Sequence, residues 1–486
     1  MTKSRLSRFC IPIVLFGSLL GHPENGFAQS VKVFRAGAAT SNITPKIGTS
    51  INGNMKDGTV TQIHDDTHAR CIVMDDGQTR LAILTVDLCM IYKEDVDEAK
   101  RRAHQITGIP VENMMISATH THSGGTACSV FQSDPDKDYL KFLQERIADA
   151  VVRAYKNLAP ARIGWGVGNE PSQVFNRRWK MKPGKPLVNP FGKVDQVKMN
   201  PGIGNPDRLE VSGPTDPGLP IISLQSLDGR PIALLANYSL HYVGGTGAGE
   251  ISADYYGMFA ARMKQLLEPV SGQHPPFVAM LSNGTSGNIN NVNWAADQPP
   301  PPAPLYSRMK EVGDIVAAEA FKTYQNVKYY NWVSLGSAQK EIELGVRLPD
   351  INEINKAKEV MAKANSPVMN TMEEIYARET MLIKDFPAKV SLILQAFRVG
   401  DLAIAAAPCE IFVEIGLDIK SKSPFNTTFT TSLANGYNGY LPTPEHHKLG
   451  GYETWRARSS YLEVDASTKV SRVIFELLNK LKSEQH

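Results

Sequence analysis

The stretch Arg80–Val86, with the sequence RLAILTV, is an uninterrupted apolar run that ends at a charged residue, Asp87. The charged segment Lys93–Gln105, KEDVDEAKRRAHQ, follows it and has the composition of a helix on the protein surface. A second apolar run, Asn113–Ala118 (NMMISA), then leads into His120. This order of strand, helix and strand predicts an α/β sheet with crossover helices.

Further segments extend the same pattern. The stretch Lys137–Tyr155 carries apolar residues at helical spacing, and Gly400-Asp401 between two apolar runs predicts a hairpin. We expect further helices at Asp254–Leu267, Met309–Tyr324, Ile351–Ala364 and Ser467–Lys482, and further strands at Pro220–Gln225, Pro231–Leu240, Phe277–Leu281, Ser391–Val399 and Leu402–Ala407. The whole pattern predicts an α/β fold with a mixed central sheet flanked by helices, in one large domain from residue 29 to residue 486.

The segment Asn169–Gly218 lacks this periodicity. It is rich in proline, glycine, asparagine and lysine, and it carries Arg177 near its start. We expect a long irregular excursion from the sheet, of a kind that is usually functional or disordered.

The first 28 residues have the features of a cleaved signal peptide. Basic residues open the chain, the apolar run Phe9–Leu20 is too short to span a bilayer, and small residues flank position 28. No later stretch reaches the ~20 apolar residues of a transmembrane helix. We therefore expect a secreted or periplasmic protein without a transmembrane segment.

The composition excludes several classes of protein. A net charge of +3 on 486 residues gives no reason to expect a nucleic-acid partner. The four cysteines after residue 28 are too few for a disulfide scaffold, although one or two bridges are compatible with export. Most of them lie in apolar, strand-like runs, where buried free thiols are expected.

Polar residues follow the ends of four predicted strands. They are His120, His241, Ser286 and Glu410. Ligand sites in open α/β sheets form where strands end, so these residues are candidates for one site.

The triplet His120-Thr121-His122 is the best candidate for metal binding. On an extended segment, residues two apart point to the same face, so both imidazoles can bind one metal ion. Imidazole and carboxylate suit Zn²⁺, and Glu410 can supply the carboxylate. Ser286 lies between Gly284 and Gly287 after a strand, but it does not fit the G-x-S-x-G pattern of a nucleophilic serine.

Two segments carry the most specific motifs of the chain, Thr85–Ile91 (TVDLCMI) and Ala118–Gly124 (ATHTHSG). Together with weaker ones, these motifs resemble those of the neutral (non-lysosomal) ceramidases, over roughly residues 34 to 460. Weaker matches are Ala36–Ala39 with Asn42–Pro45, and Ile63–Arg70, in which Asp66 replaces an arginine of the family pattern.

The resemblance implies a single catalytic Zn²⁺ with four protein ligands: His120, His241, Glu410 and Tyr440. It implies that Tyr452 stabilises the oxyanion, that His122 and Arg177 face the substrate, and that the family's active-site serine corresponds to Ser286. The family pattern around that serine is Gly-Asp-x-Ser-Pro-Asn, whereas this chain has NGTSGN at 283–288. Ser286 is therefore expected to hydrogen-bond the substrate, with nucleophilic attack as the alternative.

These observations predict a zinc-dependent hydrolase that cleaves an N-acyl amide bond with metal-activated water. We expect the chain to comprise the catalytic domain without the family's C-terminal immunoglobulin-like domain. Two alternatives stay open: a zinc esterase, deacetylase or carbohydrate-active enzyme on a polar glycan, and a non-catalytic exported binding protein. The expected partner is a small lipid or glycan molecule.

Overall fold

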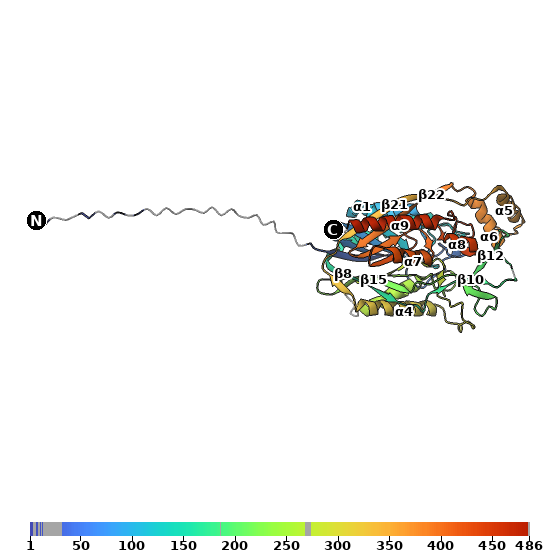
Figure 1. Ribbon diagram of the computed structural model, residues 1–486, viewed down its shortest axis with the longest axis horizontal. Helices are drawn as coiled ribbons and strands as arrows, with labels where there is room; N and C mark the ends of the chain where they lie inside the picture. Colours follow the sequence, from blue (N-terminus) through green and yellow to red (C-terminus); the bar gives the residue numbers. More distant parts are fainter. Residues whose placement is uncertain are drawn as a thin grey trace. The chain divides into compact units, whose positions relative to one another are not determined.

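The apolar run at residues 80–86 is strand β6 (Arg80–Val86), and it pairs in parallel with β7 (Met114–Ala118). Helix α1 (Lys93–Thr107) connects the two strands. The predicted strand, helix and strand order is thus confirmed in a computed structural model of the chain (Figure 1).

The structure describes residues 32–184, 186–267 and 274–484, together with a few isolated residues before residue 13. The predicted signal peptide, residues 1–28, lies almost entirely outside the described residues, so export stays a prediction. Within the described part of the chain, no helix combines the length and the apolar character needed to span a bilayer.

A nine-stranded mixed sheet forms the centre of the unit that begins at Val33. Its strand order is β18-β16-β15-β8-β1-β5-β6-β7, and β20 pairs with β8. The bounds are β1 Arg35–Asn42, β5 His68–Asp75, β8 Ala159–Asn169, β15 Gly218–Ser226, β16 Pro231–Tyr238, β18 Val278–Asn283 and β20 Lys328–Tyr330. The pairs β6–β7 and β16–β18 are parallel, and the other pairs are antiparallel. The predicted mixed sheet is therefore correct.

The sheet curves so that its two halves pack face to face. Along β5, Cys71 and Val73 belong to one apolar cluster, while Ile72 and Met74 belong to another that also includes Ile222 from β15. This alternation with a period of two is what a strand buried on both faces requires. The inner cluster is filled from both halves and also by residues of a second sheet, such as Phe397 and Ile404.

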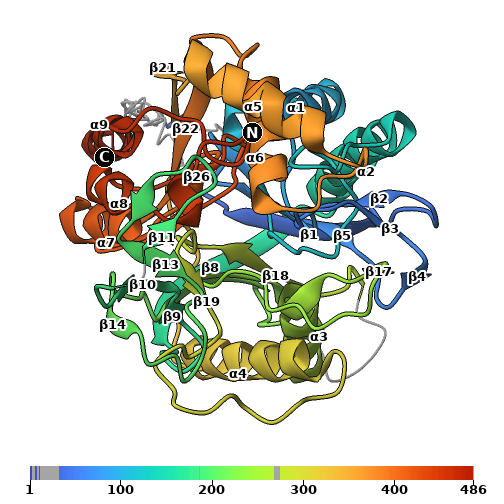
Figure 2. The ribbon, with the colours of Figure 1, turned by 90° about the vertical axis from the view of Figure 1, so that its right-hand side faces the viewer.

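Helices cover the two outer faces. Helices α1 and α2 (Lys137–Lys156) lie beyond β1 and β5, and α3 (Asp254–Leu267) and α4 (Ser307–Tyr324) lie beyond β8, β15 and β18 (Figure 2). The four helices were predicted within a few residues of these bounds. The predicted buried thiols are also confirmed, since Cys71, Cys89, Cys128 and Cys409 are free and buried.

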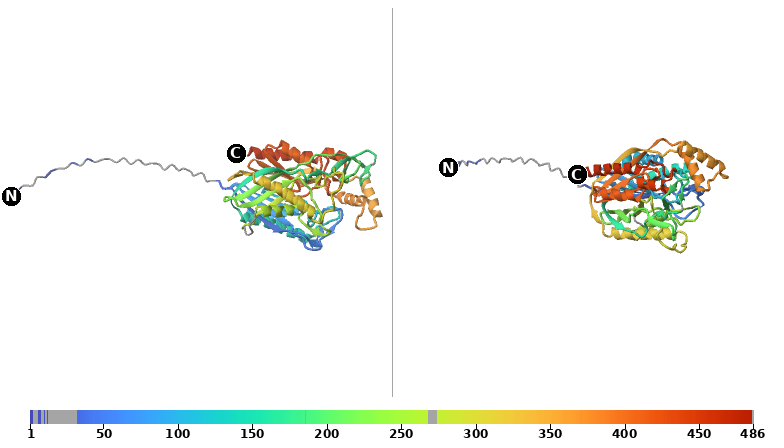
Figure 3. Two further views of the ribbon diagram at one scale, coloured as in Figure 1. Left: turned by 90° about the horizontal axis from the view of Figure 1, so that it is seen from below. Right: turned by 45° about the vertical axis from the view of Figure 1, so that its right-hand side comes forward.

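A second, four-stranded sheet has the order β21-β22-β23-β25. Strands β22 (Lys389–Val399) and β23 (Leu402–Ala406) form the predicted hairpin around Gly400, whose φ of 58° suits glycine. The C-terminal helix α9 (Ala466–Ser483) packs on β21 (Leu335–Gly345) and β22 (Figure 3). The remaining elements here are β25 Thr427–Thr431, α5 Ile351–Lys363, α6 Met372–Ile383, α7 Val413–Lys422 and α8 Pro444–Leu449.

The excursion between β8 and β15 is long, as predicted, but it is built from short strands. These are β9 Phe175–Asn176, β10 Arg178–Met181, β11 Leu187–Val188, β12 Val194–Asp195, β13 Val197–Met199 and β14 Arg208–Val211. Strand β10 pairs with both β13 and β14, and β11 and β12 form a hairpin. The short elements β2 Ser50–Ile51, β3 Gly58–Thr59, β4 Gln62–Ile63, β17 Glu250–Ile251 and β19 Ile289–Asn290 complete the strands around the site.

One buried cation provides a test of the packing of α1. The Lys100 side chain is only 3% exposed, and its Nζ donates to Asn435 Oδ1 at 2.8 Å. Burial lowers the pKa of Lys100 to about 8. Between pH 8 and the unfolded pKa of about 10.4, the folded state loses the proton first, so the free energy of unfolding rises with pH.

Comparison of the wild type with Lys100→Met isolates this effect. We expect the wild type to gain about 3 kcal/mol relative to the variant between pH 7.5 and 10.5, as measured by urea unfolding at each pH. Other titrating groups are common to both proteins and cancel in the difference. A difference that does not change with pH contradicts the assignment.

Candidate metal centre and adjoining cavity

Three buried side chains converge from distant parts of the chain. His120 Nε2 lies 3.0 Å from His241 Nε2 and 3.2 Å from Glu410 Oε2, and His241 Nε2 lies 3.9 Å from Glu410 Oε2. Ligand atoms held tetrahedrally at the usual zinc distances are about 3.3 Å apart. The three residues therefore form a buried group that can hold one metal ion.

Strand ends bring these residues together. His120 follows β7, and His241 follows β16, whose parallel neighbour β18 leads to Ser286. Glu410 lies in β24 (Glu410–Ile411), which pairs in parallel with β26 (Tyr440–Leu441) and aligns Glu410 with Tyr440. The prediction that strand ends gather the site residues is confirmed for this group.

The prediction that His120 and His122 lie on one face of an extended segment is wrong. His120 has a φ of 78°, in the left-handed region, so the segment is not extended there. The two rings meet edge to face, with their Nε2 atoms 3.3 Å apart. The backbone reversal at His120, rather than the period of a strand, brings them together.

Backbone carbonyls fix the tautomers of both candidate ligands. His120 Nδ1 donates to Cys89 O at 2.8 Å, and His241 Nδ1 donates to Ser286 O at 3.2 Å. In the neutral form, each ring therefore directs the lone pair of Nε2 toward the other ring and toward Glu410. Such carbonyl partners are typical of metal-binding histidines.

The converging lone pairs need a positive charge between them. Burial lowers the pKa of His120, but the negative charge of Glu410 outweighs it and raises the pKa well above the ordinary value. Burial, together with the charge of Arg177, lowers the pKa of His241 far below its usual range. Glu410 Oε2 has no hydrogen-bond partner although it is buried. A metal ion placed between His120, His241 and Glu410 would accept a lone pair from each of the three side chains.

Tyr437 orients the carboxylate of Glu410. The Tyr437 hydroxyl donates to Glu410 Oε1 at 3.0 Å, which leaves Oε2 facing the two histidines. Tyr437 precedes Tyr440 in the same loop, and sequence reasoning missed it. Its signal was its place between two glycines of NGYNGY, beside the expected ligand.

The variant Tyr437→Phe tests this orientation. We expect metal affinity to fall about 10–100-fold, because loss of the partner that orients a ligand has this typical effect. Competition with a chelator measures the change. Tyr461→Phe is the matched control, since the Tyr461 hydroxyl bonds Asn438 and no candidate ligand. Equal affinities for the two variants would contradict the role of Tyr437.

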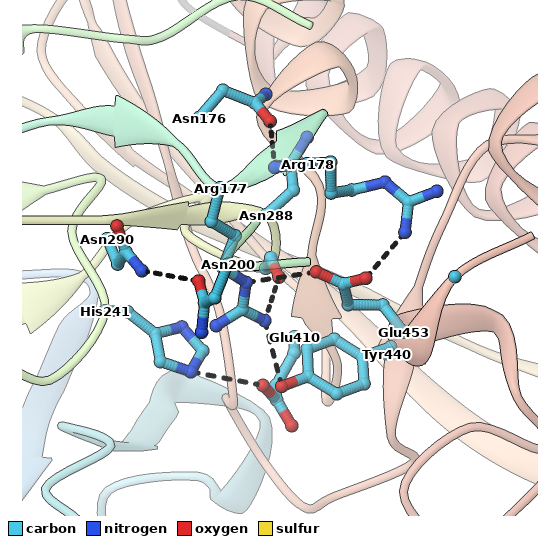
Figure 4. A network of polar contacts seen from close by, with 12 residues as sticks. Asn176, Arg177, Arg178, Asn200, His241, Asn288, Asn290, Glu410, Tyr440 and Glu453 are labelled. Atoms are coloured by element: carbon cyan, nitrogen blue, oxygen red, sulfur yellow. Dashed lines mark hydrogen bonds and ion pairs between the residues drawn. The ribbon is translucent and has the colours of Figure 1, made fainter. Parts of the chain in front are cut away.

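Two arginines share one carboxylate beside this group. Arg177 Nε lies 3.0 Å from Glu453 Oε1, and Arg178 Nη1 lies 2.5 Å from Glu453 Oε2 (Figure 4). Arg177 Nη2 also donates to the Tyr440 hydroxyl at 3.1 Å. All four side chains are buried, so Arg177 is held rigidly between Glu453 and Tyr440.

A cavity of about 370 Å³ adjoins the metal-binding group. His122, Arg177, His241, Tyr440 and Tyr452 line it on the side of the group. Its other walls include the apolar residues Met55, Leu187, Val188, Val197, Met199 and Trp455, and the polar residues Asp195, Lys198 and Asn200. The excursion between β8 and β15 thus supplies much of the wall.

Tyr242 is a cavity residue that sequence reasoning missed. Its ring stacks on His122, with 3.6 Å between centroids and 15° between the ring planes. The backbone N–H groups of Val243 and Gly244 donate to Asp254, which fixes the chain just after Tyr242. Its position directly after His241, before a glycine-rich stretch, was the available signal.

Ser286 lies behind His241 rather than on the cavity. Its hydroxyl donates to Asn283 Oδ1 at 2.7 Å, and the residue is 3% exposed. Among the described residues that line the cavity, Ser286 is absent. Its contact with the site is the carbonyl that accepts the His241 Nδ1 proton.

No protein-family model matches the chain. Among curated proteins, it is 24% identical to neutral ceramidase B of Dictyostelium discoideum over 241 residues, and 22% identical to neutral ceramidase A of the same organism over 280 residues. It is 22% identical to the neutral ceramidase of Pseudomonas aeruginosa over 456 residues. These matches cover 47%, 53% and 80% of this chain, but 31%, 36% and 64% of the relatives, so each spans less than two thirds of the relative's length.

Two solved structures share the fold of the chain. The crystal structure of neutral ceramidase from Pseudomonas aeruginosa matches 93% of this chain and 75% of its own, with a TM-score of 0.71 and 19% identity. A structure described as ceramidase complexed with C2 matches 93% of this chain and 76% of its own, with a TM-score of 0.71 and 18% identity. The chain is thus distantly similar in sequence to neutral ceramidases and shares the fold of the solved ones.

Proposed function

We propose that the protein is an exported, zinc-dependent hydrolase that cleaves an N-acyl amide bond. The observation that carries this proposal is the buried group of His120, His241 and Glu410 beside a cavity, with the lone pairs of both imidazoles directed at one point. The similarity to neutral ceramidases supports amide hydrolysis as the reaction.

The donor set favours zinc. Two imidazoles and one carboxylate suit zinc in hydrolytic sites that keep a position for water. When bound, zinc supplies polarisation of the amide carbonyl and activation of the attacking water. Tyr440 is the proposed fourth ligand, because it is aligned with Glu410 and Arg177 donates to its oxygen, which favours negative charge there.

The cavity residues would act on the substrate itself. We assign to His122 and Tyr452 hydrogen bonds to the carbonyl oxygen as it becomes negative. Losing one such donor typically slows a reaction by ~10²–10³. Arg177, fixed by Glu453, would orient the polar part of the substrate.

Ser286 has a positioning role in this proposal. Its hydroxyl is bound to Asn283, and its carbonyl holds the His241 ring. It therefore acts through His241 and makes no direct attack on the substrate.

A second candidate is deacylation of a more polar compound, such as an N-acetylated glycan, by the same group. The observation that favours it is the polar wall formed by Asp195, Lys198 and Asn200. A long apolar groove would not carry these residues.

The test is hydrolysis by the zinc-loaded protein. Fluorescent ceramides with short and long acyl chains are compared with N-acetylated sugars, at a measured zinc content. Release of the acyl group that depends on zinc supports the proposal, and the preferred series separates the two candidates. If the protein binds zinc stoichiometrically but hydrolyses neither series, the proposed hydrolase function is wrong and the alternative of a non-catalytic binding protein stands.

A further inference from the structure

Lys198 places an unpaired positive charge at the cavity. It lies in β13, lines the cavity and stays exposed to solvent. Within the described residues it makes no ion pair, whereas Lys180 on the neighbouring strand β10 is paired with Glu210 at 2.7 Å. The charge of Lys198 is thus available to a molecule in the cavity.

The carboxylate of Asp195 also lines the cavity, and within the described residues it forms no ion pair with Lys198. Asp195 Oδ2 accepts from Trp455 Nε1 at 2.7 Å, and Asp195 Oδ1 accepts from Asn189 Nδ2 at 3.0 Å. Both oxygens therefore serve to fix the hairpin of β11 and β12 to Trp455. Among the described residues that line the cavity, no other carboxylate is present.

The deeper wall adds positive charge as well. Arg177 lines this wall, and it shares the carboxylate of Glu453 with the buried Arg178. The charged side chains that line the cavity are thus two basic ones, Lys198 and Arg177, and one acidic one, Asp195. A net positive lining between apolar walls concentrates anionic ligands.

We propose that the substrate is an N-acyl amino acid, whose carboxylate is held by Lys198 and whose acyl chain packs on Leu187, Val188 and Met199. This inference rests on the proposed amide hydrolysis and names its substrate class. In that reaction the amide C–N bond breaks, water supplies the hydroxyl that becomes part of the released carboxylic acid, and the remaining proton goes to the amine. The products are a fatty acid and a free amino acid.

The closing experiment uses a matched pair of substrates. N-dodecanoylglycine and N-dodecanoylethanolamine have the same acyl chain and the same spacing, but only the first carries a carboxylate. We expect kcat/KM of the zinc-loaded protein to favour the glycine compound about three- to tenfold at low salt, and less at physiological ionic strength. Lys198→Met should remove this preference, and Lys180→Met should keep it.

Each outcome separates the two proposals. Equal activity on both compounds in the wild type, or a preference that survives Lys198→Met, overturns the carboxylate inference and leaves amide hydrolysis standing. If neither compound is hydrolysed although ceramides or N-acetylated sugars are, the inference is overturned and amide hydrolysis stands. If none of these amides is hydrolysed, the proposed function fails, and calorimetric binding of the same pair decides the inference alone. Tighter binding of the glycine compound that is lost in Lys198→Met supports it, and equal binding overturns it.

Discussion

Replacing His241 with alanine is expected to abolish stoichiometric metal binding and zinc-dependent hydrolysis. The substitution removes one of three donors that point at a single site and leaves Glu410 Oε2 and His120 Nε2 without their common neighbour. The loss of affinity should exceed the ~10–100-fold that follows from removing a partner that only orients a ligand. Metal analysis after dialysis, combined with circular dichroism, measures the effect.

His446→Ala is the control for that experiment. His446 is also a buried histidine, but it contacts Ser212 O and Glu414 rather than the metal-binding group. It should keep one metal ion per chain. If His241→Ala still binds zinc with unchanged affinity, the metal centre is wrongly located. If both variants lose the metal, the loss reflects unfolding.

The second large effect is expected for Glu453→Ala. This change leaves the guanidinium groups of Arg177 and Arg178 buried without a counter-charge, and Glu453 itself is fully buried. Breaking a buried ion pair from one side typically destabilises a protein by about 3–5 kcal/mol. The free energy of unfolding in urea should fall by this amount, at equal metal content.

Glu210→Ala provides the comparison. Glu210 pairs with Lys180 at the surface, where an ion pair contributes about 0–1 kcal/mol. A loss below about 1 kcal/mol for Glu453→Ala would mean that solvent reaches the two arginines. The positive charge that Arg177 brings to the cavity wall would then be screened.

The regular part of the fold could be predicted from the sequence because its apolar runs are continuous. Strands β6, β7, β16 and β22 and helices α1 to α4 begin and end close to their predicted residues. Strand β8 was missed, because glycines at 164, 166 and 168 hide its pattern. A Cβ at Gly164 would lie 2.3 Å from Val327. Close packing therefore requires glycine at this position, although glycine is unfavourable inside a strand.

The site could be predicted only in part. Strand ends indicated His120, His241 and Glu410, and the family resemblance added Tyr440. The contacts of Tyr437 with Glu410 and of Tyr242 with His122 depend on loop conformation. The pairing of Arg177 with Glu453 joins residues 276 positions apart, and no local pattern indicates such a contact.

The position of the metal-binding group has a consequence for folding. His120 comes from one half of the curved sheet, His241 comes from the other half, and Glu410 follows a strand of the second sheet. An ion bound by all three would be a cross-link between separately packed parts of the molecule, closing chain loops of more than a hundred residues. A ligand that binds only the folded state adds its binding free energy to stability. The group would then protect the folded chain against unfolding and proteolysis, and selection could retain it for that reason even in a relative that had lost its substrate.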